Sequence, residues 1–122
     1  MAGQIVLGNL VIDHDRYEVW VEEKRVGLTF LEFELLMLLA RNAGKVVARD
    51  RLIRTIWGAP MEGQDRKLTV HMSRLRKKLE RSQSWHIQTI TKRGYALMNP
   101  NSEPRASPEG DESTPLSQTG QL

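Results

Sequence analysis

Residues 66–80 read Arg66-Lys-Leu-Thr-Val-His-Met-Ser-Arg-Leu-Arg-Lys-Lys-Leu-Glu80. This stretch is the most informative about the fold, so the other segments are interpreted in relation to it. The apolar residues of this stretch recur at steps of four, three and four, as on one side of a helix: Leu68, Met72, Leu75 and Leu79. The opposite side of the same helix carries Arg66, Val70, Ser73, Arg74 and Lys77. The stretch is therefore expected to form a helix with one buried stripe and one cationic face.

The cationic face has two interpretations. A basic helix of this width fits the major groove of B-DNA, where an arginine can pair with guanine through two hydrogen bonds. Val70 is isolated on the charged face and is suited to contact a thymine methyl group. A solvated face on an ordinary packed helix accounts for the same residues equally well, so the neighbouring segments have to distinguish the two.

A β-hairpin is expected directly after this helix. Ser82-Gln-Ser84 breaks the helical pattern, Trp85 returns to the core, and two strands follow at residues 87–90 and 95–98. The turn between them, Thr91-Lys-Arg-Gly94, is basic and contains a glycine suited to positive φ. A basic helix followed by a basic hairpin is a winged helix-turn-helix arrangement, with the helix in the major groove and the wing on an adjacent minor groove or phosphate.

Two helices are predicted before the basic one. Thr29-Phe-Leu-Glu32 is a capping box, and the apolar run at residues 35–39 continues it as a mostly buried helix that Gly44 terminates. Arg49 to Trp57 predicts a shorter helix that ends at Gly58. Ala48 lacks the side-chain oxygen of a good N-cap residue, and its lost cap costs about 1 kcal/mol. A loop over residues 58–65 joins this helix to the basic one.

The N-terminal segment predicts three or four short antiparallel strands at residues 5–7, 10–12, 17–21 and 24–27. Asp13-His-Asp15 is interpreted as a polar turn between two strands, because the sequence places no further ligand to complete a metal site. The fold class is therefore α+β: a winged helix-turn-helix with an N-terminal antiparallel sheet, three helices and a C-terminal β-hairpin wing.

Length and charge divide the chain into one domain and a tail. The 122 residues suffice for a single domain, which we place at residues 1–98, and residues 99–122 are predicted to be a disordered acidic tail rich in Pro, Ser and Glu. Residues 101–122 carry a net charge of −3, which leaves +6 on residues 1–100 because the whole chain carries +3. A basic domain of this kind favours a polyanionic partner.

Composition also excludes several classes of function. The chain has no cysteine, which rules out disulfides and thiol chemistry. No apolar run approaches the roughly 20 residues of a membrane span, so a cytoplasmic protein without membrane contact is expected. Three scattered histidines provide no set of acid, base and nucleophile. We therefore expect no enzyme, no catalytic residues, no metal and no cofactor.

Several motifs together resemble the effector domain of OmpR/PhoB-type response regulators. They follow in order from about Ile5 to Met98: Leu28-Thr-Phe-Leu-Glu-Phe33, Gly44-Lys-Val-Val47 with Arg49 and Leu52, Trp57-Gly58, Val70-His-Met-Ser-Arg-Leu-Arg76 and Arg93-Gly-Tyr95. The resemblance implies sequence-specific binding of double-stranded promoter DNA, usually by two copies in tandem on direct repeats. It also implies a transcription-regulating role in a two-component system, with a loop that contacts RNA polymerase.

The resemblance assigns roles to individual residues. The positions that face the groove and read bases are Arg66, Thr69, Val70, Ser73 and Arg74. The positions beside phosphates are Trp57, Lys67, His71, Arg76, Lys77, Thr89 and Tyr95, of which Trp57 and Tyr95 are large aromatics whose default role is packing. The wing residues are Thr91, Lys92 and Arg93. The polymerase-contact loop is Ala59, Pro60, Met61, Glu62, Gly63, Gln64 and Asp65.

Two questions stay open at this point. The receiver domain that precedes such effector domains is not in this sequence, so the chain is either one domain of a larger regulator or a regulator controlled by another route. The function also has an alternative: a winged-helix protein-interaction module that binds a regulator or RNA polymerase without specific DNA readout. That alternative predicts acidic or bulky apolar residues on the groove face, and here that face is basic.

Overall fold

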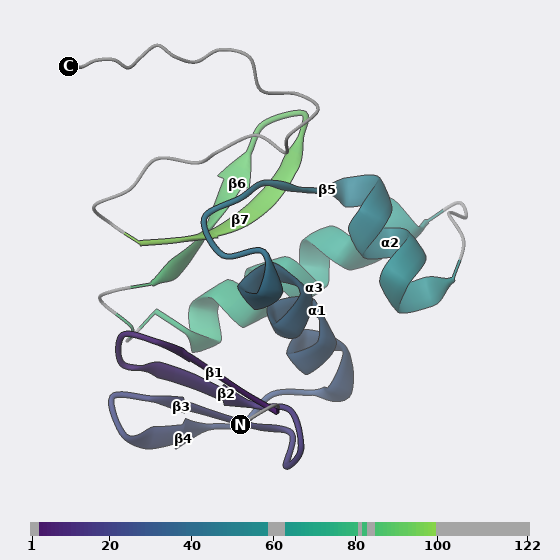
Figure 1. Ribbon diagram of the computed structural model, residues 1–122. Helices are drawn as coiled ribbons and strands as arrows, with labels where there is room; N and C mark the ends of the chain where they lie inside the picture. Colours follow the sequence, from purple (N-terminus) through teal and green to yellow (C-terminus); the bar gives the residue numbers. More distant parts are fainter. Residues whose placement is uncertain (1–2, 59–62, 81, 83–84, 100–122) are drawn as a thin grey trace, which may run out of the picture.

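The computed structural model describes residues 3–58, 63–80, 82 and 85–99. Its elements follow in the order expected from the sequence, with one additional short strand (Figure 1). They are β1 (Gln4–Leu7), β2 (Leu10–Asp13), β3 (Glu18–Val21), β4 (Lys24–Val26), α1 (Phe30–Arg41), β5 (Val47–Ala48), α2 (Arg49–Trp57), α3 (Gln64–Lys78), β6 (His86–Ile90) and β7 (Gly94–Met98). The α+β winged helix-turn-helix architecture is confirmed. No helix within the described ranges is long and apolar enough to cross a membrane.

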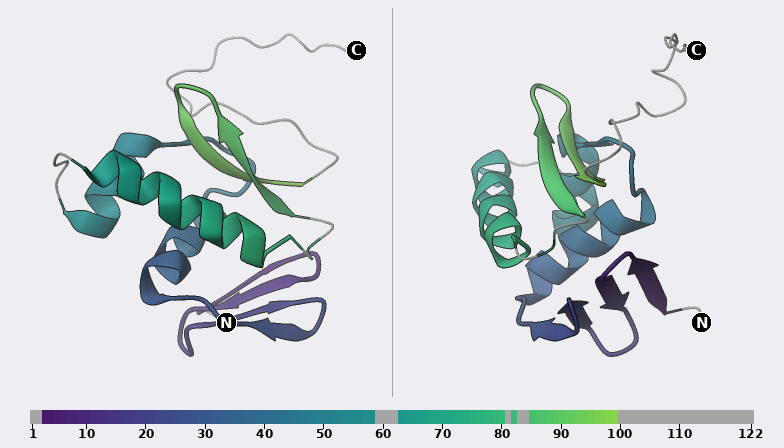
Figure 2. Two further views of the ribbon diagram at one scale, coloured as in Figure 1. Left: turned by 180° about the vertical axis from the view of Figure 1, so that it is seen from behind. Right: turned by 90° about the vertical axis from the view of Figure 1, so that its left-hand side faces the viewer.

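The N-terminal sheet is a four-stranded antiparallel meander in the order β1-β2-β3-β4. Its inward side chains alternate with outward ones and are buried: Leu10, Ile12, Val19 and Val21. The third strand begins at Glu18 and not at Tyr17, because Tyr17 adopts a left-handed turn conformation with φ +54°. The sheet lies at the opposite end of the molecule from the β6–β7 hairpin, with the helices between them (Figure 2).

Helix α1 begins with the expected capping box. The Glu32 amide donates to Thr29 Oγ1 at 3.2 Å, and the Thr29 amide donates to Glu32 Oε1 at 2.9 Å. The helix ends at Arg41, before the expected terminator Gly44. Gly44 is left-handed, with φ +81°, but it acts in the following loop, where its amide donates to the Leu97 carbonyl at 2.9 Å. Gly44 therefore directs the chain onto β7.

Helices α2 and α3 form the helix-turn-helix. Helix α2 has no side-chain cap at Ala48, as expected, and Gly58 follows its last residue with φ +92°. Helix α3 begins at Gln64, two residues before the predicted start, directly after Gly63 with φ +90°. The predicted stripe of α3 is confirmed, since each of its four members is at most 2% exposed: Leu68, Met72, Leu75 and Leu79. Together with the sheets and α1 they form one hydrophobic core.

The second sheet has three strands in the order β5-β7-β6, of which β5 was not expected from the sequence. Val47 pairs with Tyr95 and Ala48 pairs with Gly94. A Cβ atom at Gly94 would collide with the Val47 carbonyl oxygen, so glycine permits this close approach of two backbones. Within the turn itself the left-handed residue is Lys92, with φ +65°. The short strand β5 thus anchors the hairpin to the segment between α1 and α2.

Candidate nucleic-acid interface

The outer face of α3 is the main basic surface of the described chain. In the left view of Figure 2, α3 crosses the front of the molecule, and no described element lies in front of it. The residues predicted for this face are all exposed: Arg66, Lys67, Thr69, Val70, Ser73, Arg74 and Lys77. Val70 is the only apolar residue among them and is 41% exposed. The face matches the predicted cationic side of the helix.

The side chains of the four cations on this face form no hydrogen bond or ion pair with other described residues. Arg66, Lys67, Arg74 and Lys77 make no side-chain hydrogen bond or ion pair with any residue that the structure describes. All four side chains are exposed, so their charges are accessible to an anionic partner. The other residues of the same helix face, Thr69, Val70 and Ser73, carry no charge and so do not neutralise these cations.

Thr69 differs from these cations because its hydroxyl is already bonded within the protein. Thr69 Oγ1 donates to the Asp65 carbonyl at 3.1 Å and accepts from Arg49 Nη2 at 3.0 Å. The side chain stays exposed at the edge of the face, so a base can approach its methyl group. Thr69 was predicted to read a base, but these two hydrogen bonds within the protein could not be predicted from the sequence.

His71 and Trp57 lie together at one flank of α3. Their ring centroids are 6.1 Å apart with an angle of 37° between the ring planes. His71 Nδ1 is buried and has no hydrogen-bond partner among the described residues. Both rings are half-buried, so their edges reach the surface. The structure therefore brings together two residues that were predicted separately as phosphate neighbours.

Arg76 and Thr89, also predicted beside phosphates, contact one another. Arg76 Nη2 donates to Thr89 Oγ1 at 2.5 Å, and Arg76 Nε donates to the Ile87 carbonyl at 3.1 Å. This half-buried arginine therefore joins the C-terminal half of α3 to β6. Its guanidinium orients the hairpin as well as contributing charge.

The hairpin tip carries the wing residues Thr91, Lys92 and Arg93, and all three are exposed. The Arg93 amide donates to the Ile90 carbonyl at 2.9 Å and closes the turn. Tyr95, the next aromatic residue along β7, is buried at 4% exposure. Its hydroxyl oxygen accepts a hydrogen bond from Arg49 Nη1 at 2.9 Å.

Arg49 was not among the predicted site residues, although it stood in the quoted family motif. Its side chain is 31% exposed and bonds to two elements besides its own helix, through Asp65 and Thr69 of α3 and Tyr95 of β7. Burial tends to lower the pKa of Arg49, but hydrogen bonds to Tyr95 and Asp65 outweigh burial and raise the pKa above its usual value. Sequence spacing gives no signal for such a contact, because its partners are 16 to 46 residues away.

The predicted polymerase-contact loop is only partly described. Ala59, Pro60, Met61 and Glu62 lie outside the described residues. Gly63 is exposed, Gln64 is 7% exposed and begins α3, and Asp65 bonds to Arg49 Nε at 3.2 Å. The predicted tail also lies outside the described residues beyond Asn99.

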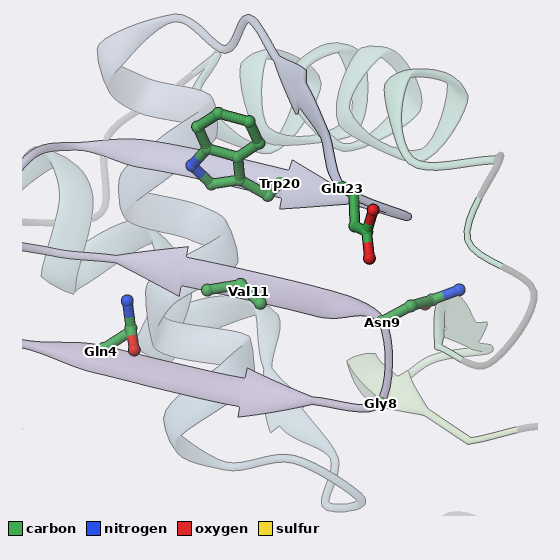
Figure 3. Close-up of a pocket in the computed structure, with 6 residues that line it drawn as sticks. All are labelled: Gln4, Gly8, Asn9, Val11, Trp20 and Glu23. Atoms are coloured by element: carbon green, nitrogen blue, oxygen red, sulfur yellow. The ribbon is translucent and has the colours of Figure 1, made fainter.

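A second surface feature lies on the outer face of the N-terminal sheet. A hollow there is lined by Gln4, Gly8, Asn9, Val11, Trp20 and Glu23 (Figure 3). Its lining has one charged residue, the acidic Glu23, and a large aromatic surface in Trp20. An acidic, partly apolar hollow does not suit a phosphate backbone. The basic face of α3 with the hairpin tip is therefore the better candidate interface.

Comparisons with known proteins agree with this arrangement. The family described as "Transcriptional regulatory protein, C terminal" matches residues 23–97. The alkaline phosphatase synthesis transcriptional regulatory protein PhoP of Bacillus subtilis is 42% identical over 102 residues, which are 82% of this chain and 42% of PhoP. The chain therefore spans less than half the length of this relative.

Solved structures are similar over most of the chain. The Klebsiella pneumoniae RstA DNA-binding domain, crystallised in complex with the RstA box, has a TM-score of 0.70 and 34% identity, over 78% of this chain and 96% of that one. The Thermotoga maritima response regulator DrrB, an OmpR/PhoB homologue, has a TM-score of 0.68 and 37% identity, over 80% of this chain and 45% of that one.

Proposed function

The chain belongs to the family of C-terminal effector domains of OmpR/PhoB-type transcriptional regulators, and on that premise we propose that it binds specific sites in double-stranded promoter DNA and so regulates transcription. The observation that carries the proposal is the outer face of α3, where Arg66, Lys67, Arg74 and Lys77 have no partner among the described residues. Exposed cations that are not paired within the protein can neutralise the phosphates of a DNA backbone.

Base readout is proposed for the groove-facing residues of α3. Arg66 and Arg74 are free to pair with guanine through two hydrogen bonds, and Val70 offers an apolar contact to a thymine methyl group. Ser73 contributes a short polar contact. Thr69 contributes its exposed methyl group, while its hydroxyl stays bonded to Asp65 and Arg49.

Phosphate contacts are proposed for residues along the two flanks of this face. Lys67 and Lys77 act through their free charges, and the paired rings of Trp57 and His71 form a surface against the backbone. Arg76, Thr89 and Tyr95 are proposed to serve chiefly by holding the hairpin, because their polar groups are bonded within the protein. Thr91, Lys92 and Arg93 contact the adjacent minor groove or its phosphates.

The proposed partners follow from the family. Two copies bind in tandem on direct repeats, and residues 59–65 contact RNA polymerase. The domain acts by binding, without catalysis, in the cytoplasm. The alternative of a protein-interaction module without DNA readout is less well supported, because Val70 is the one apolar residue on a face that otherwise offers free cations.

The test is selection from a pool of random duplexes at near-physiological salt, followed by measurement of affinity against salt. An enriched motif is expected, repeated at a spacing of about one helical turn. The log-log salt slope is expected at about −4 to −5, for roughly five neutralised phosphates. Weak, unselective binding with a flat salt response would reject the proposal.

A matched pair of variants locates the binding surface. Arg66→Gln with Arg74→Gln removes two charges from α3, and Arg16→Gln with Lys24→Gln removes two exposed charges from the N-terminal sheet. Only the first pair is expected to abolish selective binding and to lower the salt slope. Equal loss in both pairs would show that net charge, and not the face of α3, determines binding.

A further inference from the structure

The Arg49 side chain contacts α3, the proposed recognition helix, and β7 of the hairpin, the proposed wing, at the same time. Nε lies 3.2 Å from Asp65 Oδ1, and Nη2 donates to the Asp65 carbonyl at 2.8 Å and to Thr69 Oγ1 at 3.0 Å. Nη1 donates to the Tyr95 hydroxyl at 2.9 Å, and the guanidinium carbon lies 5.6 Å from the centre of the Tyr95 ring. One planar group thus bonds to the first turns of α3 and to β7.

The backbone of the same residue adds a further link. The Arg49 amide donates to the Arg93 carbonyl at 3.3 Å, at the end of the wing tip. Arg49 therefore bonds to the hairpin through its main chain and its side chain. Only the side chain extends that connection to α3.

Among the described residues, the hairpin has one other polar link to α3, through Arg76 and β6. Two arginines thus hold the two strands of the hairpin to the same helix, Arg49 near its beginning and Arg76 near its end. Strand β5 pairs with β7 and runs directly into α2, so it holds the hairpin to α3 only indirectly, through α2. Without the Arg49 side chain, the hairpin keeps its core contacts and the Arg76 link to α3, but no described polar contact holds β7 to the first turns of α3.

A lysine could not replace this arrangement. The guanidinium presents several N–H donors in a rigid plane, which here reach four acceptors on two elements, whereas an ammonium is a compact point charge. The Arg49 side chain is 31% exposed but the Asp65 side chain is 78% exposed, so the ion pair alone contributes little and the bonds to Thr69, Tyr95 and the Asp65 carbonyl are needed to hold the guanidinium.

We propose that Arg49 is a positioning residue that fixes the orientation of the β6–β7 hairpin relative to α3, so that the wing and the recognition helix contact one duplex together. This inference deepens the proposed function and rests on it only for the step that involves DNA. The orientation itself is a property of the free protein.

The first experiment therefore uses the free protein. Residual dipolar couplings of backbone amides report the orientation of β6–β7 relative to α3 in the full chain, in Arg49→Met and in Arg54→Met. Arg54 is a matched control, because it is an arginine of the same helix whose only ion pair is with Asp50 one turn away, as far as the described residues show. Arg49→Met is expected to change or average the hairpin orientation, and Arg54→Met to preserve it. A wild-type orientation in Arg49→Met would overturn the inference.

A second, milder variant keeps the inference testable if Arg49→Met does not fold. Tyr95→Phe removes the hydroxyl that accepts from Arg49 but keeps the buried ring. It is expected to shift the hairpin couplings in the same direction as Arg49→Met, by a smaller amount, with an unchanged core. If Arg49→Met does not fold, unchanged couplings in Tyr95→Phe would reject the inference.

The second experiment measures affinity for the duplex enriched by selection. Arg49→Met is expected to weaken binding about tenfold and Arg54→Met by less than about twofold. Lys92→Ala at the wing tip is expected to weaken binding in the parent but to have a clearly smaller effect in Arg49→Met, because a displaced wing no longer contacts the duplex. Equal effects of Lys92→Ala in both backgrounds would contradict the positioning role. If the parent protein selects no duplex, the proposed function fails, while the couplings of the free protein still decide whether Arg49 orients the hairpin.

Discussion

Lys78 Nζ lies 2.6 Å from Glu32 Oε1, so an ion pair joins the last turn of α3 to the first turn of α1. The Glu32 side chain is 1% exposed and its Oε1 also accepts from the Thr29 amide, as part of the capping box. Burial alone tends to raise the pKa of Glu32, but the hydrogen bonds from Lys78 and Thr29 outweigh it and lower the pKa below its usual value of 4.5. The residue that caps α1 therefore also holds the last turn of α3.

The stability of the domain is expected to depend on this carboxylate in acid. Because the pKa of Glu32 is lower in the folded chain than in the unfolded chain, its stabilisation is complete above the unfolded-state pKa and is lost as pH falls through the folded-state pKa. The free energy of unfolding, measured in urea from pH 7 to pH 3, should therefore fall in the parent. In Glu32→Gln it should be lower by about 1–3 kcal/mol at pH 7 and should fall less steeply in acid. Parallel profiles would contradict this role of Glu32.

Gly94 is expected to tolerate no side chain. Gly94→Ala places a Cβ against the Val47 carbonyl and should lower the free energy of unfolding by at least about 2 kcal/mol, as the β5–β7 pairing has to open. Gly27→Ala is the matched control, because a Cβ at Gly27 meets no atom within 4 Å. Thermal unfolding of both variants checks the expectation, and similar midpoints for the two would refute it.

Lys92 is expected to lower the stability of the fold through its backbone conformation and to strengthen DNA binding through its charge. It adopts a left-handed conformation that costs a residue with a Cβ about 1–2 kcal/mol. Lys92→Gly relieves this strain, whereas Lys92→Ala keeps it, and both remove the charge. The glycine variant should therefore be more stable than the alanine variant by about 0.5–1 kcal/mol, with the same reduced affinity for DNA. Affinities that differ between the two variants would show that the wing contributes through its backbone and not through the Lys92 charge.

Arg74 is expected to read a base without supporting the fold. Arg74→Ala should weaken binding to the enriched duplex by about 1–3 kcal/mol and should relax the preference at one base pair. Its unfolding midpoint should stay unchanged, because Arg74 contacts no described residue through a hydrogen bond or ion pair. Arg16→Ala, in the turn between β2 and β3, serves as the control for charge. A uniform loss at all positions of the site would make Arg74 a phosphate contact instead.

Local patterns predicted most of the fold. The capping box at Thr29 and the stripe from Leu68 to Leu79 were confirmed, because each depends on residues three or four positions apart. Strand β5 was missed because it has only two residues, too few to show the alternation of apolar and polar side chains that indicates a strand. The predicted role of Gly94 in the turn also differed, since its partner Val47 is far away in sequence.

The positions of the charged residues of the candidate site could be predicted from the sequence, but the hydrogen bonds between its elements could not. The exposed cations of α3 followed from helical geometry, which fixes the side of the helix on which a residue lies. The hydrogen bonds of Arg49, Arg76 and Tyr95 did not, because they join elements whose relative placement depends on the whole core. These contacts determine which polar groups remain free for a partner.

The most direct test of the proposed interface is a titration of isotopically labelled full-length chain with the enriched duplex, followed by the backbone amide resonances. The largest changes are expected in two regions, residues 66–77 of α3 and residues 91–93 of the hairpin tip, with small changes in β1–β4. Changes centred on the outer face of the N-terminal sheet, around Val11 and Trp20, would contradict the account and place the duplex elsewhere.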